Sequence, residues 1–209
     1  GVAVVRSLMA RGDRVIAADT DASAVGLRLG HEATILPPAA ADDYAAAVAR
    51  EAFCYGVQLV IPTVAEELVA LASQHQVLDD AGVACWTPSV PALLRCIDKL
   101  AFAQTLRASA IPTPFTTANV DDAGAGPWIV KPRRGRGSRD VYRADTLDEL
   151  RFAVGHVDDP IIQERVHGYE FTVDALVDRD GTLIAAVPRL RLETKAGIST
   201  KGETFHDST

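Results

Sequence analysis

Short apolar runs alternate with helical segments through the first half of the chain. The runs are of strand length and cover residues 14–19, 33–36, 57–61 and 83–86. The first ends in an acid, and a proline follows the second and the third. Helical patterns cover residues 1–10, 42–55 and 64–80, and Asp42 or Asp43 is a plausible cap for the second. Strands that alternate with helices favour parallel pairing with helices packed on the sheet. We therefore expect a Rossmann-like α/β domain over residues 1–97.

This domain should open with a strand, but the chain opens with a helical segment. Gly1 would suit the last glycine of a glycine-rich turn from a strand into a helix. We therefore expect the first strand to precede Gly1. Asp19, at the end of an apolar run, leaves a dinucleotide-binding oxidoreductase open, because such an acid can bind a ribose.

The pattern changes after Pro91. A helical segment over residues 93–109 ends at Ile111-Pro-Thr-Pro114, which breaks the helix. Strand-like runs and one helix follow, at residues 128–132, 141–143, 146–155 (the helix) and 161–166. Two further runs, residues 171–177 and 183–192, are joined by a hairpin turn. The pattern predicts an antiparallel α+β domain over residues 98–209.

The charge balance is acidic, with 21 Lys and Arg against 28 Asp and Glu. Nucleic acids and anionic lipids both attract basic surfaces, so we expect no nucleic-acid partner and no membrane partner. One basic cluster stands apart, and it fits either a specific anion or a solvated loop: Lys131, Arg133, Arg134, Arg136 and Arg139.

The cysteines and histidines point to no catalytic or metal site. The three cysteines include no CxxC spacing, and the five histidines form no HxxxH or HxH pair. Reduced thiols are typical of an intracellular protein, so we expect a cytoplasmic location.

Lys131 ends a strand and precedes a small-residue loop of Gly135, Arg136, Gly137 and Ser138. Glycines let backbone amides approach phosphate oxygens closely. The loop is not a Walker loop, because the lysine precedes the glycines. A plain hairpin turn is the alternative interpretation.

A second polar group follows the strand over residues 161–166. Gln163 and Glu164 end this apolar run, where backbone groups can meet the edge of an adenine. Glu170, a few residues on, could accept ribose hydroxyls. Solvent-facing acids on a strand edge would give the same pattern.

The three parts together, in this order and spacing, resemble the ATP-grasp superfamily. They are Asp98-Lys99, then Ile129-Val-Lys131-Pro with its glycine loop, then Gln163-Glu164-x-Val166-x-Gly168-x-Glu170. The similarity is greatest to carbamoyl-phosphate synthase large-subunit-like proteins and carboxylate–amine ligases. It implies a Rossmann-like domain at residues 1–97 and an ATP-grasp domain at residues 98–209.

The resemblance also implies a role for each residue of the motif. Lys99 and Lys131 would contact the phosphates of ATP from opposite sides, with Lys131 and Lys201 near the reacting phosphate. The loop of Gly135, Arg136, Gly137 and Ser138 would close over the triphosphate. The adenine and ribose would be bound by Gln163, Glu164, Val166 and Glu170.

A ligase of this kind activates a small-molecule carboxylate as an acyl-phosphate and joins it to an amine, using ATP and Mg²⁺. The resemblance implies that a late Glu-x-Asn pair helps to hold the magnesium, and no such pair precedes Thr209. We therefore expect the metal ligands beyond this chain, and we expect the chain alone to be inactive. A non-catalytic nucleotide-binding module and a homo-oligomer both stay open.

Overall fold

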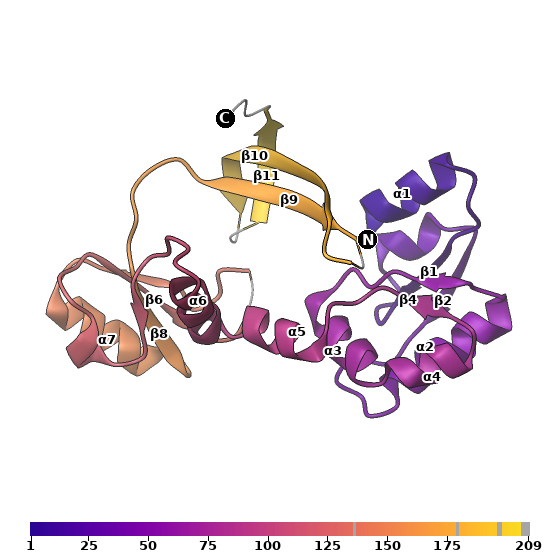
Figure 1. Ribbon diagram of the computed structural model, residues 1–209, viewed down its shortest axis with the longest axis horizontal. Helices are drawn as coiled ribbons and strands as arrows, with labels where there is room; N and C mark the ends of the chain where they lie inside the picture. Colours follow the sequence, from indigo (N-terminus) through magenta and orange to yellow (C-terminus); the bar gives the residue numbers. More distant parts are fainter. Residues whose placement is uncertain (136, 179, 196–197, 206–209) are drawn as a thin grey trace. The chain divides into compact units, whose positions relative to one another are not determined.

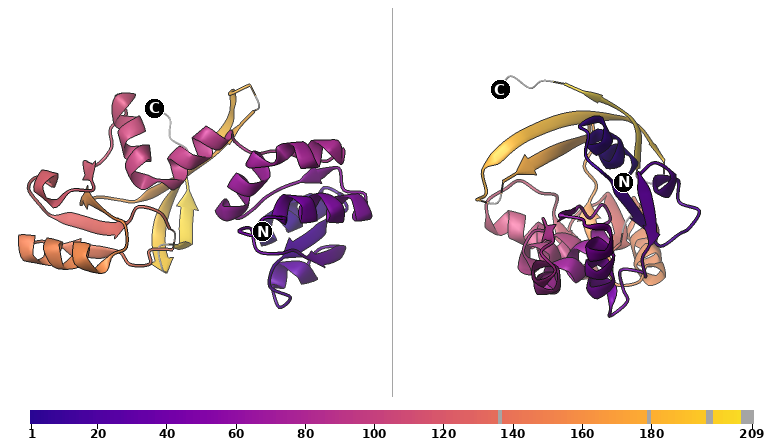
Figure 2. Two further views of the ribbon diagram at one scale, coloured as in Figure 1. Left: turned by 90° about the horizontal axis from the view of Figure 1, so that it is seen from below. Right: turned by 90° about the vertical axis from the view of Figure 1, so that its right-hand side faces the viewer.

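The computed structural model describes residues 1–135, 137–178, 180–195 and 198–205. The chain divides into two compact units, Gly1–Leu94 and Arg95–Thr209. The strands and helices of each unit can be followed in Figure 1 and Figure 2. No helix in the described ranges is long and apolar enough to cross a membrane.

The first unit contains two pairs of parallel strands. Strand β1 (Ile16–Asp19) pairs with β2 (Glu32–Ile35), and β3 (Leu59–Val60) pairs with β4 (Ala84–Cys85). The helices are α1 (Val2–Ala10), α2 (Tyr44–Tyr55), α3 (Ala65–Ser73) and α4 (His75–Asp80), with a 3-10 helix η1 (Val25–Arg28). The parallel pairing agrees with the expected α/β layer. The interpretation of this unit as a Rossmann-like domain stays a prediction.

Two local predictions for the first unit were wrong in detail. The helix expected over residues 64–80 is divided at Gln74, which ends α3 and precedes α4. Asp43 is the residue before α2, but its side chain accepts no hydrogen bond from the described backbone of that helix. The buried face of α2, which includes Ala45 and Val48, packs against Leu71 and Leu78.

Two helices stand in place of the single helix expected over residues 93–109. Helix α5 (Val90–Ile97) ends before Asp98, and α6 (Lys99–Ala108) begins after it. Asp98 has an extended backbone, and its side chain caps α6. An N-cap residue requires this non-helical backbone, so the cap itself separates the two helices.

A four-stranded antiparallel sheet follows, with strand order β5–β8–β6–β7. Its elements are β5 (Thr116–Thr117), η2 (Val120–Asp122), β6 (Trp128–Pro132), β7 (Tyr142–Ala144), α7 (Leu147–His156) and β8 (Pro160–Glu164). Strand β5 was not predicted. Helix α7 begins with a capping box formed by Thr146 and Glu149.

Helix α7 covers one face of this sheet. Trp128 and Val130 of β6 and Ile162 of β8 pack with Leu150 and other residues of α7 in one buried cluster. Successive side chains of a strand point to opposite faces. Lys131 and Gln163 alternate with these buried residues, so both lie on the other face of the sheet.

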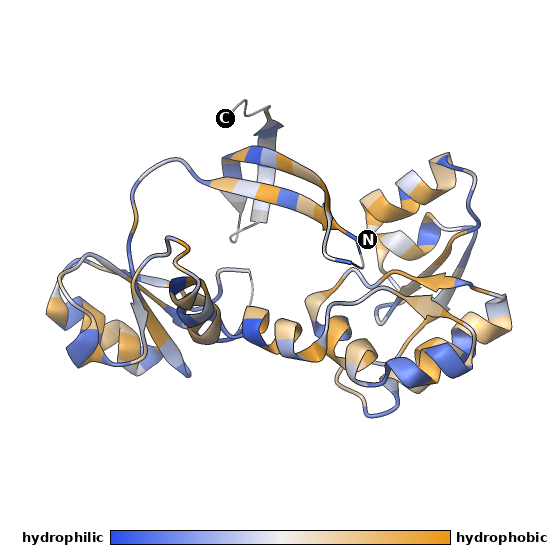
Figure 3. Cartoon of the chain, in the orientation of Figure 1, coloured by the Kyte–Doolittle hydropathy of each residue, from blue (hydrophilic) through white to orange (hydrophobic). Residues whose placement is uncertain are grey.

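A separate three-stranded sheet is formed by β9 (Phe171–Val177), β10 (Leu183–Lys195) and β11 (Ile198–Thr204). The antiparallel pairing of β9 with β10 confirms the expected hairpin. Apolar and polar residues are interspersed along β9 in Figure 3. Many of the apolar side chains are exposed, among them Val173, Leu176 and Leu183.

Candidate functional site

Lys131 is held by a chain of hydrogen bonds that crosses three strands. Its Nζ donates to Oε1 of Gln163 at 2.7 Å, and Nε2 of Gln163 donates to Oγ1 of Thr116 at 2.8 Å. The register of the sheet creates this chain, because Gln163 is opposite both Ile129 on β6 and Thr116 on β5. An amide therefore orients the ammonium group without neutralising its charge.

Lys99 lies at the first position of α6 and reaches the segment that follows β6. Its Nζ donates to the carbonyl oxygens of Pro132 and Gly135, both at 3.0 Å, and to that of Arg133 at 3.4 Å. Its backbone N–H also donates to the carbonyl of Arg133, at 3.0 Å. These hydrogen bonds hold Lys99 against residues 132–135, where the glycine loop begins.

The two lysines influence each other's protonation. Burial lowers the pKa of Lys131, and the nearby charge of Lys99 lowers it further. Burial also lowers the pKa of Lys99, partly offset by Asp98. Within the described part of the chain, neither lysine forms an ion pair with a carboxylate. Two like charges with neutral hydrogen-bond partners form a site that an anion would stabilise.

Asp98 is a buried acid at the same place, only 4% exposed. It accepts hydrogen bonds from the backbone N–H groups of Leu100 and Ala101, at 3.1 and 3.0 Å. Nε of Arg133 lies 2.8 Å from both carboxylate oxygens, and Nη2 of Arg134 lies 3.4 Å from one. The hydrogen bond from Arg133 is the largest of the effects that lower the pKa of Asp98 to about 2.

This pairing was not predicted from the sequence. Arg133 and Arg134 were expected in a basic cluster that could bind an anion, but both guanidinium groups pair with Asp98. An acid at the start of a helix is a signal for an N-cap, but it does not indicate a pairing with a residue as distant as Arg133. The sequence named Asp98 only as part of the motif.

The glycine loop has the backbone that its composition suggests. Gly135 and Gly137 have φ angles of 127° and 71°, in the region that glycine adopts readily. A Cβ at Gly135 would meet no other atom within 4 Å, so the loop is open there. Ser138 also has a positive φ, 51°. Arg136 was predicted to join this loop and lies outside the described residues.

Glu164 lies at the end of β8, beside the segment before β5. Its backbone N–H donates to the carbonyl of Phe115 at 2.9 Å, and its carboxylate accepts from the Phe115 N–H at 3.2 Å. A pocket of about 370 Å³ opens here, with Gln104, Arg107, Phe115, Thr116 and Glu164 among its lining residues. The sequence did not predict this pocket, because residues 110–116 read only as a helix-breaking extended segment. Val166, two residues beyond Glu164, is 65% exposed.

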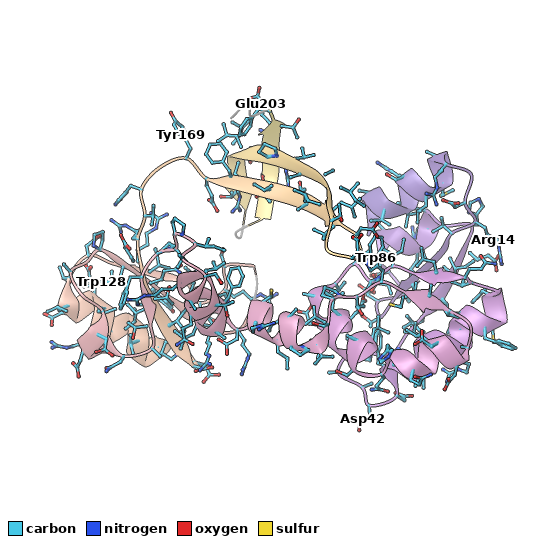
Figure 4. All side chains as sticks on the ribbon, viewed as in Figure 1. Arg14, Asp42, Trp86, Trp128, Tyr169 and Glu203 are labelled. Carbon is cyan, nitrogen blue, oxygen red and sulfur yellow. The ribbon has the colours of Figure 1, made fainter. Side chains whose placement is uncertain are left out.

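Glu170 and Lys201 belong to the three-stranded sheet rather than to the sheet that holds Lys131. Glu170 forms an ion pair with Arg191. Lys201 lies opposite Glu193 in the register and pairs with it at 2.8 Å. The exposed Tyr169 and Glu203 mark the start of β9 and the end of β11 in Figure 4. The predicted roles of Glu170 at a ribose and of Lys201 at a phosphate stay predictions.

The described residues do not offer a magnesium site. Among them, no group of three or more His, Cys, Asp or Glu side chains could hold a metal ion. Asp174 of β9 forms an ion pair with Arg189 at 3.2 Å, and Glu193 of β10 forms one with Lys201 at 2.8 Å.

Comparisons with known proteins agree on one family and one fold. The family model for the ATP-grasp domain matches residues 96–207. The fold resembles that of the L-amino acid ligase from Bacillus licheniformis, with a TM-score of 0.71 and 19% identity over 91% of this chain and 47% of the ligase. N5-carboxyaminoimidazole ribonucleotide synthetase from Thermus thermophilus gives a TM-score of 0.68 and 19% identity, over 94% of this chain and 52% of the synthetase.

A third similar structure contains bound nucleotide. It is the biotin carboxylase domain dimer of 2-oxoglutarate carboxylase from Hydrogenobacter thermophilus, in complex with MgADP, ADP and bicarbonate. The TM-score is 0.68 and the identity 17%, over 94% of this chain and 49% of that domain. The chain thus spans about half the length of these proteins. No match was found among curated protein sequences.

Proposed function

The chain belongs to the ATP-grasp family, and we propose that it binds ATP as part of an ATP-dependent ligase. Lys99, Lys131 and the glycine loop bind the phosphates, and the strand end at Gln163 and Glu164 receives the adenine. The ligase activates a small-molecule carboxylate and joins it to an amine-type nucleophile.

The observation that carries this proposal is the pair of lysines with neutral partners. Lys131 is hydrogen-bonded to an amide and Lys99 to three backbone carbonyls. Burial of uncompensated charge is unfavourable, as the lowered pKa of each lysine indicates. A polyphosphate beside an open glycine loop would remove this cost. The chain as a whole is acidic, with a net charge of −7, so the positive site is local.

The proposed chemistry needs no side-chain nucleophile. A carboxylate oxygen of the substrate attacks the terminal phosphorus of ATP, and the bond from that phosphorus to ADP breaks. The amine nitrogen then attacks the acyl carbon, phosphate leaves with the bonding electrons, and the amine loses a proton to solvent. Lys131 and Lys99 orient the phosphates and offset their negative charge. Magnesium accompanies ATP in this proposal, with ligands outside the described residues.

The pocket beside Glu164 supports the place proposed for the adenine. Its lining residues include the aromatic Phe115 and the polar Gln104 and Thr116, and its volume is about 370 Å³. Nucleobase sites commonly pair apolar walls with a few polar groups. The similar carboxylase domain from Hydrogenobacter thermophilus was solved with MgADP and ADP.

Two experiments test the proposal. Calorimetric titration with ATP and Mg²⁺ should give clear binding, while NAD⁺ should bind weakly. Tight NAD⁺ binding without ATP binding would favour the oxidoreductase alternative, in which Asp19, the last residue of β1, would bind a ribose. For the reaction, hydroxylamine should trap an acyl-phosphate as a hydroxamate when the full-length protein meets ATP and a pool of carboxylates.

A non-catalytic nucleotide-binding module is the second candidate. Lys99, Lys131 and the glycine loop would bind phosphates in such a module as well, because none of them forms or breaks a bond in the proposed ligase reaction. ATP binding without hydroxamate formation by the full-length protein, across the carboxylate pool, would support this candidate over the ligase.

A further inference from the structure

Asp98 connects two segments that are distant in the sequence. It caps the first turn of α6 through the N–H groups of Leu100 and Ala101. The same carboxylate pairs with Arg133, whose Nη2 lies 2.7 Å from Oδ2. Bidentate pairing of a guanidinium with a carboxylate fixes both distance and orientation. The start of α6 is therefore fixed against the residue that follows β6.

Arg133 is also anchored from the other side. Its backbone N–H donates to the carbonyl of Asp159 at 2.9 Å, just before β8. Its carbonyl accepts from the backbone N–H of Lys99 at 3.0 Å. Arg133 thus lies between α6 and the sheet, two residues before Gly135. Any shift of Arg133 would move both the start of the loop and the carbonyls to which Lys99 is bonded.

We propose that Asp98 is a positioning residue for the binding of nucleotide phosphates. Through Arg133 it fixes Lys99 and the start of the glycine loop in one geometry, so that the phosphates meet preorganised groups. This inference rests on the proposed function, because it assumes that ATP is the ligand. Asp98 is too buried and too well paired to bind a ligand itself.

A purely electrostatic role for Asp98 predicts the opposite change in ATP affinity, so the direction of the change distinguishes the two roles. Asp98 is a negative charge next to Lys99, and it offsets part of the positive charge of Arg133 and Arg134. Removal of that negative charge would strengthen the attraction of an anion to the site. If Asp98 acted only through its charge, Asp98→Asn would bind ATP more tightly. If Asp98 positions the site, the variant binds ATP more weakly.

The experiment is calorimetric titration of the wild-type chain and of Asp98→Asn with ATP and with adenosine. We expect ATP affinity to fall roughly tenfold in Asp98→Asn, because small misplacements of binding groups are costly. Adenosine affinity should change by less than about twofold, because adenosine lacks the phosphates. Thr146→Ala is the matched control: it removes the side-chain cap of α7, on the covered face of the same sheet, and should leave ATP affinity unchanged.

Arg133→Lys keeps the positive charge but loses the bidentate geometry, and it serves as the test if Asp98→Asn does not fold. This variant too should lower the affinity for ATP more than the affinity for adenosine. Unchanged or tighter ATP binding by a folded Asp98→Asn or Arg133→Lys chain would overturn the inference. Equal losses for ATP and adenosine would also overturn it, since they would indicate a general structural effect. Failure of the wild-type chain to bind ATP would instead refute the proposed function.

Discussion

At the residue scale, Gln163 determines whether the positive charge of Lys131 is available to a ligand. A carboxylate in its place would form an ion pair with the ammonium and cancel the charge that a phosphate needs. An amide oxygen orients the same ammonium and leaves its charge available. The hydrogen bond from Gln163 to Thr116 fixes which side of the amide faces Lys131.

Gln163→Glu should therefore weaken ATP binding roughly tenfold, which corresponds to about 1.4 kcal/mol. The new carboxylate would pair with Lys131 and would repel the phosphates. Gln76→Glu makes the same change in net charge on an exposed part of α4, and it should leave the affinity unchanged. Calorimetry compares the three chains. If Gln163→Glu and the wild type bound ATP equally well, Gln163 and Lys131 would not belong to the phosphate-binding site.

Proton uptake on ATP binding follows from the lowered pKa values of Lys99 and Lys131. Bound phosphates favour the protonated lysines and raise both pKa values again. In the alkaline range between the free and bound values, binding takes up protons, so ATP affinity falls as pH rises. Titrations at about pH 9 in two buffers of different ionisation enthalpy measure the uptake. We expect less uptake in Lys131→Met, and absence of uptake in the wild type would contradict the buried, charged pair.

The same shifts give the sign of the effect on stability. A lysine whose pKa is lower in the folded state than in the unfolded state opposes folding while it is charged. That cost is present at neutral pH and disappears as pH rises through the folded-state value toward the unfolded one. The lysines therefore serve ligand binding at the expense of stability, as expected for a binding site.

At the element scale, α7 stabilises the sheet that carries the site. Leu150 is 0% exposed within the cluster beneath β6, whereas Leu147 in the same helix is 52% exposed. Leu150→Ala should lower the free energy of unfolding by about 2–5 kcal/mol, because it leaves a cavity. Leu147→Ala should change it by less than about 0.5 kcal/mol. Urea denaturation of both variants checks this, and equal losses would contradict the packing described for α7.

The elements predicted correctly from the sequence are those whose own residues carry the periodic apolar pattern of a strand or a helix. Strands β6, β8, β9 and β10 and helix α7 each carry their own pattern of apolar residues or caps. The division of residues 93–109 at Asp98 was missed because helical periodicity continues through that position. Strand β5 was missed because it has only two residues, Thr116 and Thr117, and forms only by pairing with β8.

In the candidate site too, local features were expected from the sequence, whereas contacts between distant residues were not. The resemblance to the ATP-grasp superfamily singled out Lys99, Lys131 and the glycine loop, and their role at the phosphates stays a prediction. Their partners depend on contacts between distant residues: Asp98 with Arg133 across α6 and β6, and Lys131 with Gln163 across the sheet. Such pairs follow from strand register and helix placement, which one sequence does not specify.

At the scale of the whole molecule, the fold resembles that of ATP-grasp proteins at 17–19% identity, over about half of their length. The three-stranded sheet exposes apolar side chains such as Val173, Leu176 and Leu183. Exposed apolar patches often mark contacts with other protein surfaces. A homo-oligomer stays open, and sedimentation velocity across a range of concentrations tests it. A single monomeric species throughout would contradict it.

The central claim is that Lys99 and Lys131 form the phosphate-binding end of a nucleotide site. The most direct measurement is a titration series with adenosine, AMP, ADP and ATP, on the wild-type chain and on a Lys99→Met, Lys131→Met double variant. We predict that wild-type affinity rises as phosphates are added, and that the rise largely disappears in the double variant while adenosine affinity stays similar. Equal affinity for adenosine and ATP in the wild type, or an undiminished rise in the double variant, would contradict the claim.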